Sequence, residues 1–423
     1  MTNNTVTSPK GFLAAGISCG IKRSGRPDIG LIVCPTGATA SAVFTTNKIV
    51  SAGVLVSREH IKSRKIYAVV VNSGNANACT GRRGLNNAIA MCRQTASLIS
   101  RCSLLVSGSR YEIRDTRYAP RNVLVASTGI IGHQLPMDKI TAGIEKAAAQ
   151  LSSSARAGLD FTYAIMTTDT RPKQTVRRFT LERRATSHEP RITVAGTVKG
   201  AGMIAPRMAT TLLFITTDVA ITKPLLAKAL RHAVGQSLNK LTVDSHQSTN
   251  DTGIILASGV AGNRPIVSQC PRYRKFVAAL TDLCDDLARQ MAHDAEGATR
   301  IFKVVIKGAA TKADAAKAAR AIADYPLLKC AIHGGDPNWG RIICAAGSCG
   351  VTLNPSKLSC KLDNLTVFAN GSPANFDSKK AAKIVSQPEH TITVDLGVGS
   401  AADFCYGCDL SAAYVHINAD YHT

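Results

Sequence analysis

Three things are scarce in this sequence: aromatic side chains, acidic side chains and long apolar runs. Aromatic residues make up 5% of the 423 positions, and no recognisable nucleic-acid-binding module accompanies them. No segment approaches the roughly 18 to 20 consecutive apolar residues that a membrane-spanning helix needs. The first residues also lack the charged segment and apolar core of an export signal. We therefore expect a folded, globular protein of the cytoplasm.

The shortage of acids leaves the chain strongly basic. Lysine and arginine number 51 against 28 aspartates and glutamates, which gives a formal charge of +23 at pH 7. The basic residues concentrate in the segments 101–121 and 171–191. This charge is compatible with a nucleic-acid-binding protein, with a solvated basic face, or with a field that attracts anionic substrates. Composition leaves all three open.

The cysteines and histidines show no pattern of a disulfide framework or a metal site. Thirteen cysteines are scattered along the chain, and many lie in apolar runs such as residues 342–346. We expect buried free thiols in a reducing compartment. Cys405 and Cys408 form a single CxxC, whereas a zinc site needs a second pair or spaced histidines, so no metal is expected.

Segments of strand character alternate with segments of helical periodicity, which predicts an α/β or α+β fold. The largely β-branched run 66–71 precedes a helical pattern over 85–99. The same alternation predicts further strands and helices: strands at 11–19, 123–125, 212–221 and 301–306, and helices at 138–151, 224–238, 273–292 and 313–323. We expect a hairpin turn at 186–190 and a peripheral insertion at about 103–120.

The segment 199–218 suits a self-cleaving peptide bond. A loop with Gly200 and Gly202 runs into an apolar strand that begins with hydroxyl residues. If the threonine hydroxyl cuts the bond between Ala209 and Thr210, Thr210 becomes a new N-terminus. Its amine, with a pKa of about 7.7 to 8, can then act as the base for its own side chain. The alternative is an ordinary loop and buried strand, and the residues alone leave both open.

This segment and further blocks in the same order resemble the ornithine acetyltransferase family, also called bifunctional glutamate N-acetyltransferases. The blocks are 11–12, 20–22, 43–47, 72–81, 126–132, 166–170, 296–299, 336–341 and 418–423. The resemblance implies layered sheets and helices of the DmpA-like kind. It also implies cleavage into an α chain, 1–209, with the oxyanion-hole turn, and a β chain, 210–423, with the nucleophile and a substrate-binding tail.

The resemblance assigns roles to individual residues. Thr210 is the nucleophile, and Thr128 and Gly129 form the oxyanion hole. Lys199, in the α chain, is expected to bind the substrate's α-carboxylate, and Glu296 the cationic side chain of ornithine. The remaining substrate-binding residues are expected to be Thr167, Thr168, Asn418 and Thr423.

The activity implied is transfer of an acetyl group from N2-acetylornithine to glutamate through an acetyl-Thr210 intermediate, in the cyclic form of arginine biosynthesis. Acetyl-CoA is expected as a second acetyl donor, and no cofactor is expected. The implied assembly is a heterotetramer of two α and two β fragments, with no membrane and no nucleic acid. Two alternatives stay open: an N-terminal-nucleophile aminopeptidase or amidase of related fold, and a basic nucleic-acid-binding protein without enzymatic activity.

The chain departs from the family pattern in one loop and at one aromatic position. Where the family usually has Asp-Gly-Asp, this chain has Asp244, Ser245 and His246, so we expect a changed backbone and charge there. Tyr406 stands in place of a tryptophan. Residues 336–341, which contain the only tryptophan, are expected to form a shaped loop with a structural role.

Overall fold

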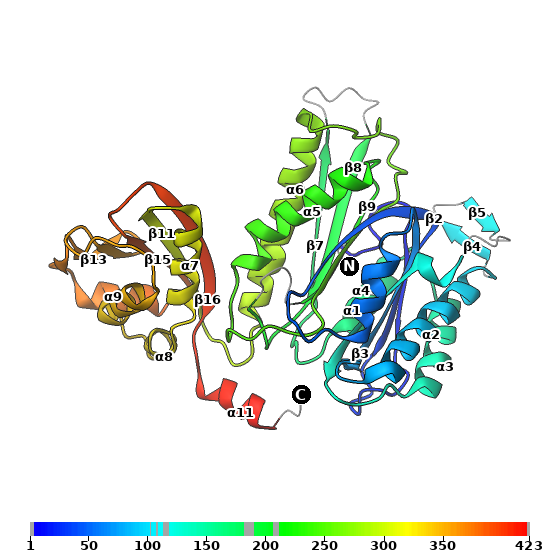
Figure 1. The fold of residues 1–423 in the computed structure, drawn as a ribbon, viewed down its shortest axis with the longest axis horizontal. Helices are drawn as coiled ribbons and strands as arrows, with labels where there is room; N and C mark the ends of the chain where they lie inside the picture. Colours follow the sequence, from blue (N-terminus) through cyan, green and yellow to red (C-terminus); the bar gives the residue numbers. More distant parts are fainter. Residues whose placement is uncertain are drawn as a thin grey trace.

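The chain forms two mixed β-sheets with helices packed against them, which confirms the predicted α/β class (Figure 1). The computed structural model describes residues 4–101, 103–106, 109–112, 118–181, 190–205 and 211–420. A separate hairpin of β4 (Ser103–Val106) and β5 (Ser109–Glu112) lies in the basic segment that we expected to be an insertion. Across the described part of the chain, no helix combines the length and the apolar character needed to cross a membrane.

The larger sheet is organised around one long strand, β2. Its eight strands are β1 (Leu13–Ile17), β2 (Ile29–Phe44), β3 (Ile66–Asn75), β6 (Val123–Ile130), β7 (Lys173–Thr180), β8 (Arg191–Lys199), β9 (Leu212–Thr217) and β10 (Thr252–Ala257). The first part of β2 pairs with β1 and β3, and its second part pairs with β10. The sheet order is β6-β3-β2-β10-β9-β8-β7. β2 therefore joins two halves of the sheet.

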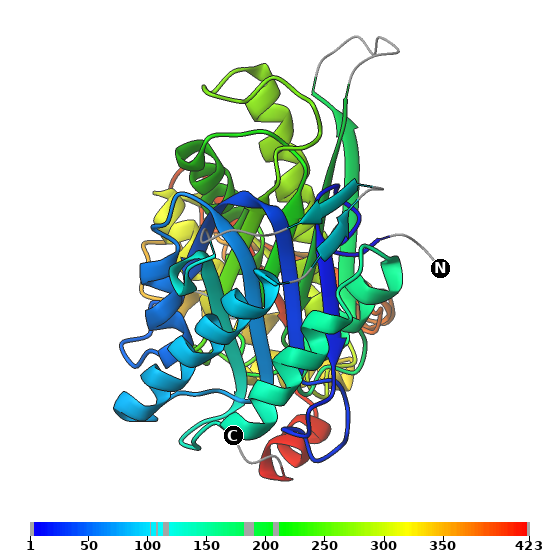
Figure 2. The same cartoon turned by 90° about the vertical axis from the view of Figure 1, so that its right-hand side faces the viewer.

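The two halves face each other, and helices cover their outer surfaces (Figures 1 and 2). Val71 and Leu124 of one half share a buried core with Phe214 and Ile254 of the other. The helices of this lobe are α1 (Ala52–His60), α2 (Gly81–Ile99), α3 (Met137–Ala149), α4 (Ala155–Ile165), α5 (Lys223–Gln236) and α6 (Pro271–His293). α1, α2 and α3 share a core with the first half, and α5 and α6 with the second. This lobe is thus a helix–sheet–sheet–helix stack.

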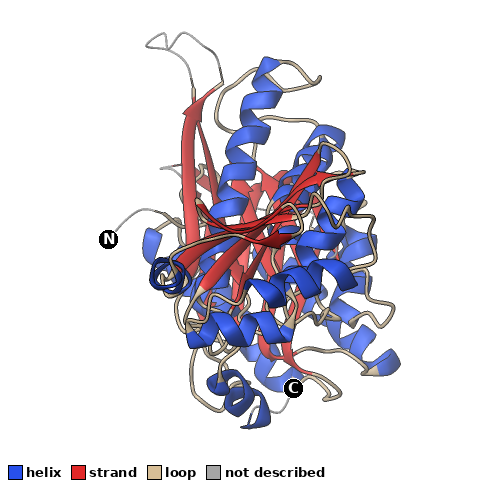
Figure 3. Cartoon of the chain, turned by 90° about the vertical axis from the view of Figure 1, so that its left-hand side faces the viewer, coloured by secondary structure: helices blue, strands red, loops and turns tan. Residues whose placement is uncertain are grey.

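The smaller sheet forms a second lobe with its own core (Figures 1 and 3). Its order is β14-β13-β12-β15-β11-β16. Its elements are β11 (Ile301–Ala309), α7 (Lys312–Ala323), α8 (Pro326–Gly334), α9 (Trp339–Ser348), β12 (Ser359–Leu362), β13 (Leu365–Ala369), β14 (Ser372–Pro373), α10 (Ser378–Val385), β15 (Glu389–Asp395) and β16 (Ala401–Cys408). After β16 the chain returns below the larger lobe as helix α11 (Ala412–Asp420) (Figure 1).

Most expected elements are confirmed, with boundaries shifted by a few residues. The helices expected at 85–99, 224–238 and 273–292 are α2, α5 and α6. The strand expected at 212–221 ends earlier, because β9 stops at Thr217. β7 and β8 pair antiparallel as a hairpin, while its turn falls almost entirely outside the described residues.

Two expectations about local structure were wrong. Residues 339–341 belong to α9 rather than to a loop, because the Asn338 side chain accepts a hydrogen bond from the Arg341 amide at 3.2 Å and caps the helix. Cys344, expected to be buried, is exposed. Ile342, Ala345 and Ala346 occupy the buried face of α9, so helical periodicity places Cys344 on the outer face.

Candidate active site

A cavity of about 270 Å³ opens where the ends of β6, β8 and β9 meet the loop before β10 and helix α11. It brings together every described residue to which the resemblance assigns a role: Thr128, Gly129, Thr167, Thr168, Lys199, Glu296 and Asn418. Ala209, Thr210 and Thr423 lie outside the described residues. Thr211, which follows Thr210 in the chain, lines the same cavity. Residues far apart in sequence thus share one small space.

The turn at the end of β6 requires glycine at position 129. Gly129 has φ +130°, and a Cβ atom there would lie 2.3 Å from the carbonyl carbon of Gly74 on the neighbouring strand β3. A larger residue would force the two strands apart. The close approach of β3 therefore fixes the backbone beside Thr128.

Asn250 holds the backbone on either side of this turn. Its side-chain amide donates to the carbonyl oxygens of Ala76 at 2.6 Å and Ser127 at 2.8 Å. The Ser127 hydroxyl in turn donates to Asn72 at 2.7 Å. All four residues are buried. Buried hydrogen bonds within the protein therefore fix the position of this turn.

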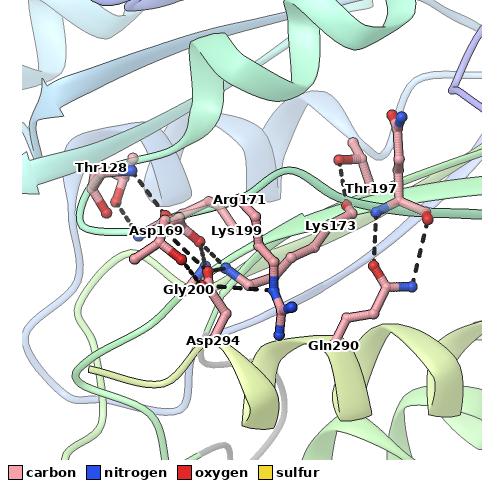
Figure 4. A network of polar contacts seen from close by, with 12 residues as sticks. Thr128, Asp169, Arg171, Lys173, Thr197, Lys199, Gly200, Gln290 and Asp294 are labelled. Carbon is pink, nitrogen blue, oxygen red and sulfur yellow. Dashed lines mark hydrogen bonds and ion pairs between the residues drawn. The ribbon is translucent and has the colours of Figure 1, made fainter. Parts of the chain in front are cut away.

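Asp169, Lys173 and Asp294 form a buried ionic network (Figure 4). The Asp169 carboxylate accepts hydrogen bonds from the amides of Thr167 at 2.9 Å and Gly200 at 2.7 Å. The Lys173 ammonium pairs with both Asp169 and Asp294. All three ionic side chains are at most 2% exposed. The network joins the threonine segment to the loop that follows Lys199.

The network shifts the pKa values of the groups around it. Burial alone would raise the pKa of the Asp169 carboxyl. The nearby ammonium groups of Lys173 and Lys199, with the hydrogen bonds it accepts, instead lower that pKa from 3.8 to about 2. Burial lowers the pKa of the Lys199 ammonium, and Asp169 opposes this shift. Lys199 Nζ donates to the hydroxyl oxygen of Thr128 at 3.3 Å, so it lies directly beside the β6 turn.

Glu296 lines the cavity together with Gly202 and α11. Its amide donates to the carbonyl oxygen of Ala201 at 3.0 Å, and its carboxylate accepts from Asn418 Nδ2 at 2.9 Å. A Cβ atom on Gly202 would lie 2.2 Å from Glu296 Oε2, so a larger residue at position 202 would displace the Glu296 carboxylate. The cavity therefore presents a negative group at Glu296 and a positive group at Lys199.

The loop that departs from the family pattern forms another part of the wall. Asp244 accepts hydrogen bonds from the amides of Met203 at 2.6 Å and Ile204 at 2.9 Å. Ser245 has φ +64°, the left-handed conformation that glycine adopts more easily. His246 lines the cavity with a side chain that is 71% exposed. The backbone thus adopts a glycine-like conformation although a serine stands at position 245. His246 stands where the family usually has a second acid, so the loop has one carboxylate fewer.

Several residues of the cavity wall and of the adjacent buried ionic network were not singled out from the sequence. Asp169, Lys173 and Asn250 act through contacts with residues far away in the chain, which no local pattern displays. Asp251 lines the cavity as well and is 2% exposed. Among the described residues, no group of three or more histidine, cysteine or acidic side chains is placed to hold a metal ion.

Comparisons with known proteins give consistent relatives. The family model described as the ArgJ family matches residues 13–423. The arginine biosynthesis bifunctional protein ArgJ of Symbiobacterium thermophilum is 41% identical over 420 residues, covering 99% of this chain and 98% of the relative. The protein of the same name from Caldanaerobacter subterraneus is also 41% identical, covering 98% of each. The crystal structure of ArgJ from Bacillus halodurans is 37% identical, covers 49% of this chain and 98% of its own, and has a TM-score of 0.48.

Proposed function

The chain belongs to the ArgJ family, and from that membership we propose that it moves an acetyl group from N2-acetylornithine to glutamate. It is a glutamate N-acetyltransferase of the ornithine acetyltransferase type, acting in arginine biosynthesis. We infer in addition that it matures by cleavage between Ala209 and Thr210, and that Thr210 carries the acetyl group between the two substrates.

The placement of opposite charges in one cavity supports this choice of substrates. N2-acetylornithine carries one carboxylate and one side-chain ammonium, separated by a short aliphatic chain. Lys199 and Glu296 lie on the wall of the same 270 Å³ cavity and offer one partner of each sign. A lysine and a glutamate fixed in this way select a substrate with both charges over one with a single charge.

In the first half-reaction we infer that the Thr210 hydroxyl attacks the acetyl carbonyl carbon. The hydroxyl proton passes to the Thr210 amine as a C–O bond forms. The C–N bond then breaks and the departing nitrogen takes up a proton, so ornithine leaves as an amine. The negative oxygen of the tetrahedral intermediate is held by Thr128 and Gly129. Because Lys199 donates to the oxygen of the Thr128 hydroxyl, the hydrogen of that hydroxyl is free to point at the oxyanion.

In the second half-reaction the amine of glutamate attacks the acetyl-Thr210 ester. A C–N bond forms and the glutamate nitrogen gives up the proton that the ornithine nitrogen took up in the first half-reaction. The C–O bond breaks, and the threonine oxygen recovers its proton from the Thr210 ammonium. The product is N-acetylglutamate and the free enzyme. The same oxyanion donors serve both halves, because both pass through a tetrahedral intermediate at the same carbon.

Ornithine release from N2-acetylornithine, measured with and without glutamate, tests the reaction. An acetyltransferase releases ornithine rapidly only when glutamate is present. An amidase would release it at the same rate in both cases, with water as the acceptor. Replacing N2-acetylornithine by acetyl-CoA tests the second donor: N-acetylglutamate formation supports it, and its absence would remove acetyl-CoA from the proposal.

Intact mass spectrometry tests the maturation step. The wild type is expected as two fragments, 1–209 and 210–423, and Thr210→Ala as one uncut chain. Thr210→Ser keeps a hydroxyl and is expected to be partly cut. A wild-type chain that stays whole and still transfers acetyl groups would contradict the proposed nucleophile. The mass of the native particle would show whether two copies of each fragment assemble.

A further inference from the structure

Two buried polar atoms of the cavity wall have no hydrogen-bond partner among the described residues. They are Oδ2 of Asp251, a residue that is 2% exposed, and Oγ1 of Thr211, which is 5% exposed. Buried polar groups in native proteins are nearly always paired, so an unpaired polar group that lines a cavity is a candidate contact for a bound ligand. Both atoms indicate a polar ligand group at this part of the cavity.

The surroundings of Asp251 favour the protonated form of its carboxyl. Burial raises its pKa well above 3.8, and the Ser248 hydroxyl and the Lys199 ammonium only partly oppose this. The other charged or titratable side chains on the cavity wall are Lys199, Glu296, Asp244, His246 and Tyr414. Of these, Asp244 is engaged by backbone amides and by the Tyr414 hydroxyl. Asp251 is therefore an acid that can give up a proton inside the cavity.

The backbone around Asp251 is tied to the residue that follows the inferred nucleophile. The amide of Thr252 donates to the carbonyl oxygen of Thr211 at 2.8 Å, where β10 begins to run parallel to β9. The amide of Thr45 donates to the carbonyl oxygen of Asp251 at 2.9 Å. These bonds hold the backbone on both sides of the carboxyl, so its position does not depend on a mobile loop.

We propose that Asp251 is a further catalytic residue that carries the proton of the reacting nitrogen. This step rests on the acetyl transfer proposed above. In the first half-reaction the neutral carboxyl gives its proton to the amide nitrogen as the C–N bond breaks, so ornithine leaves as an amine and Asp251 becomes a carboxylate. In the second, the glutamate nitrogen forms its C–N bond and loses a proton to that carboxylate. Meanwhile the hydroxyl proton of Thr210 rests on the threonine amine, so the ammonium and the carboxylate form and vanish together.

Asp251→Asn tests the proposal, because asparagine keeps the size and a hydrogen-bond donor but cannot transfer a proton. The purified variant is expected to be folded and cut like the wild type, with KM little changed. Its kcat should fall by about 10²- to 10⁴-fold, the usual contribution of a general acid and base. The bell-shaped pH dependence of kcat/KM should lose one of its two limbs. A variant that keeps wild-type kcat and both limbs would overturn the proposal.

Asp218→Asn is the matched control. Asp218 is also buried, at 1% exposed, and burial raises its pKa as well. It accepts hydrogen bonds from the amides of Thr193 at 2.8 Å and Lys10 at 3.4 Å and does not line the cavity. This variant should keep the wild-type kcat and pH profile even if its melting temperature falls. If the pH profile of Asp218→Asn lost the same limb as that of Asp251→Asn, the change would not be specific to Asp251, and the proposal would fail.

Two further arms keep the outcome decisive. If Asp251→Asn is recovered unfolded, Asp251→Glu replaces it, because this variant retains an acid in a changed environment. The limb of the pH profile assigned to Asp251 should then shift along the pH axis. An unshifted limb overturns the proposal. A wild type that shows no glutamate-dependent ornithine release would refute the acetyl transfer itself. An active wild type with an equally active Asp251→Asn refutes only the role of Asp251.

Discussion

Two buried aspartates beside the same cavity, Asp169 and Asp251, behave in opposite ways. Asp169 is 1% exposed and accepts hydrogen bonds from two backbone amides and from Lys173, and its pKa falls to about 2. Asp251 is 2% exposed, its Oδ2 has no partner among the described residues, and its pKa rises. Burial is the same in both, so the partners decide the charge. Asp169 finds its partners within the protein, whereas Oδ2 of Asp251 has none among the described residues.

The largest effect is expected when the cation that pairs with Asp169 is removed. Lys173→Met leaves Asp169 and Asp294 buried without their shared ammonium. Removing one partner of a buried ion pair typically destabilises a protein by about 3 to 5 kcal/mol. We expect a loss of that size in the free energy of unfolding, measured by urea denaturation at pH 7.

Lys62→Met is the matched control for this loss. Lys62 pairs with Glu59 at 2.7 Å, but both side chains are about 70% exposed. Exposed pairs contribute only about 0 to 1 kcal/mol. If both variants lost the same small amount, the buried network would have no special role in stability.

The low pKa of Asp169 predicts a pH dependence of stability. Its folded pKa is about 2 against an ordinary value of 3.8, so the ionised form is favoured by folding. The resulting stabilisation, on the order of 2 to 3 kcal/mol, is fully present above pH 3.8 and is lost as the pH falls through about 2. The difference in unfolding free energy between wild type and Asp169→Asn, followed from pH 7 to 2, should shrink accordingly. A constant difference would place the pKa of Asp169 near its ordinary value.

The raised pKa of Asp251 predicts a pH dependence of stability with the opposite sign. The folded pKa of Asp251 lies above its unfolded value, so its contribution is favourable at low pH and is lost as the pH rises through the folded pKa. At pH 7 an exposed aspartate of the unfolded chain is ionised, so keeping Asp251 neutral in the folded protein costs free energy. An uncharged asparagine removes this cost. We expect Asp251→Asn to unfold within about 1 kcal/mol of the wild type, or to be more stable. A loss as large as that of Asp169→Asn would make Asp251 a structural residue.

The contrast between these aspartates also shows what the sequence can and cannot reveal. Helical periodicity located α6 to within two residues at its start, because the repeat of buried side chains is local. The proline and glycine of residues 336–341 instead predicted a loop and misplaced Trp339, since the cap at Asn338 decides whether the next residue is helical. The presence of a helix or strand can thus be predicted from neighbouring residues in the chain. Its exact ends depend on single hydrogen bonds that the sequence does not reveal.

Part of the candidate site could likewise be predicted from the sequence, and part could not. Thr128, Lys199 and Glu296 stand in blocks that resemble a family, so their presence in one cavity could be expected before the fold was known. The opposite pKa shifts of Asp169 and Asp251 could not, because they depend on Lys173, on Asp294 and on an Oδ2 of Asp251 that has no hydrogen-bond partner among the described residues. An aspartate in a sequence has no visible burial or partner, and both come only from the packed chain.

Another carboxylate of the cavity wall, Asp244, allows the smallest and most selective change. Its bonds to the amides of Met203 and Ile204 resemble those of Asp169, but the next residue, Ser245, holds an unfavourable φ of +64°. Ser245→Gly relieves that strain, worth roughly 1 kcal/mol, and gives back roughly 0.5 to 1 kcal/mol through a more flexible unfolded chain. We expect the free energy of unfolding to rise by at most about 0.5 kcal/mol, with kcat and its pH profile unchanged, because Ser245 is exposed and no carboxylate is altered. A loss above about 1 kcal/mol in urea denaturation would show that the serine side chain itself stabilises the loop.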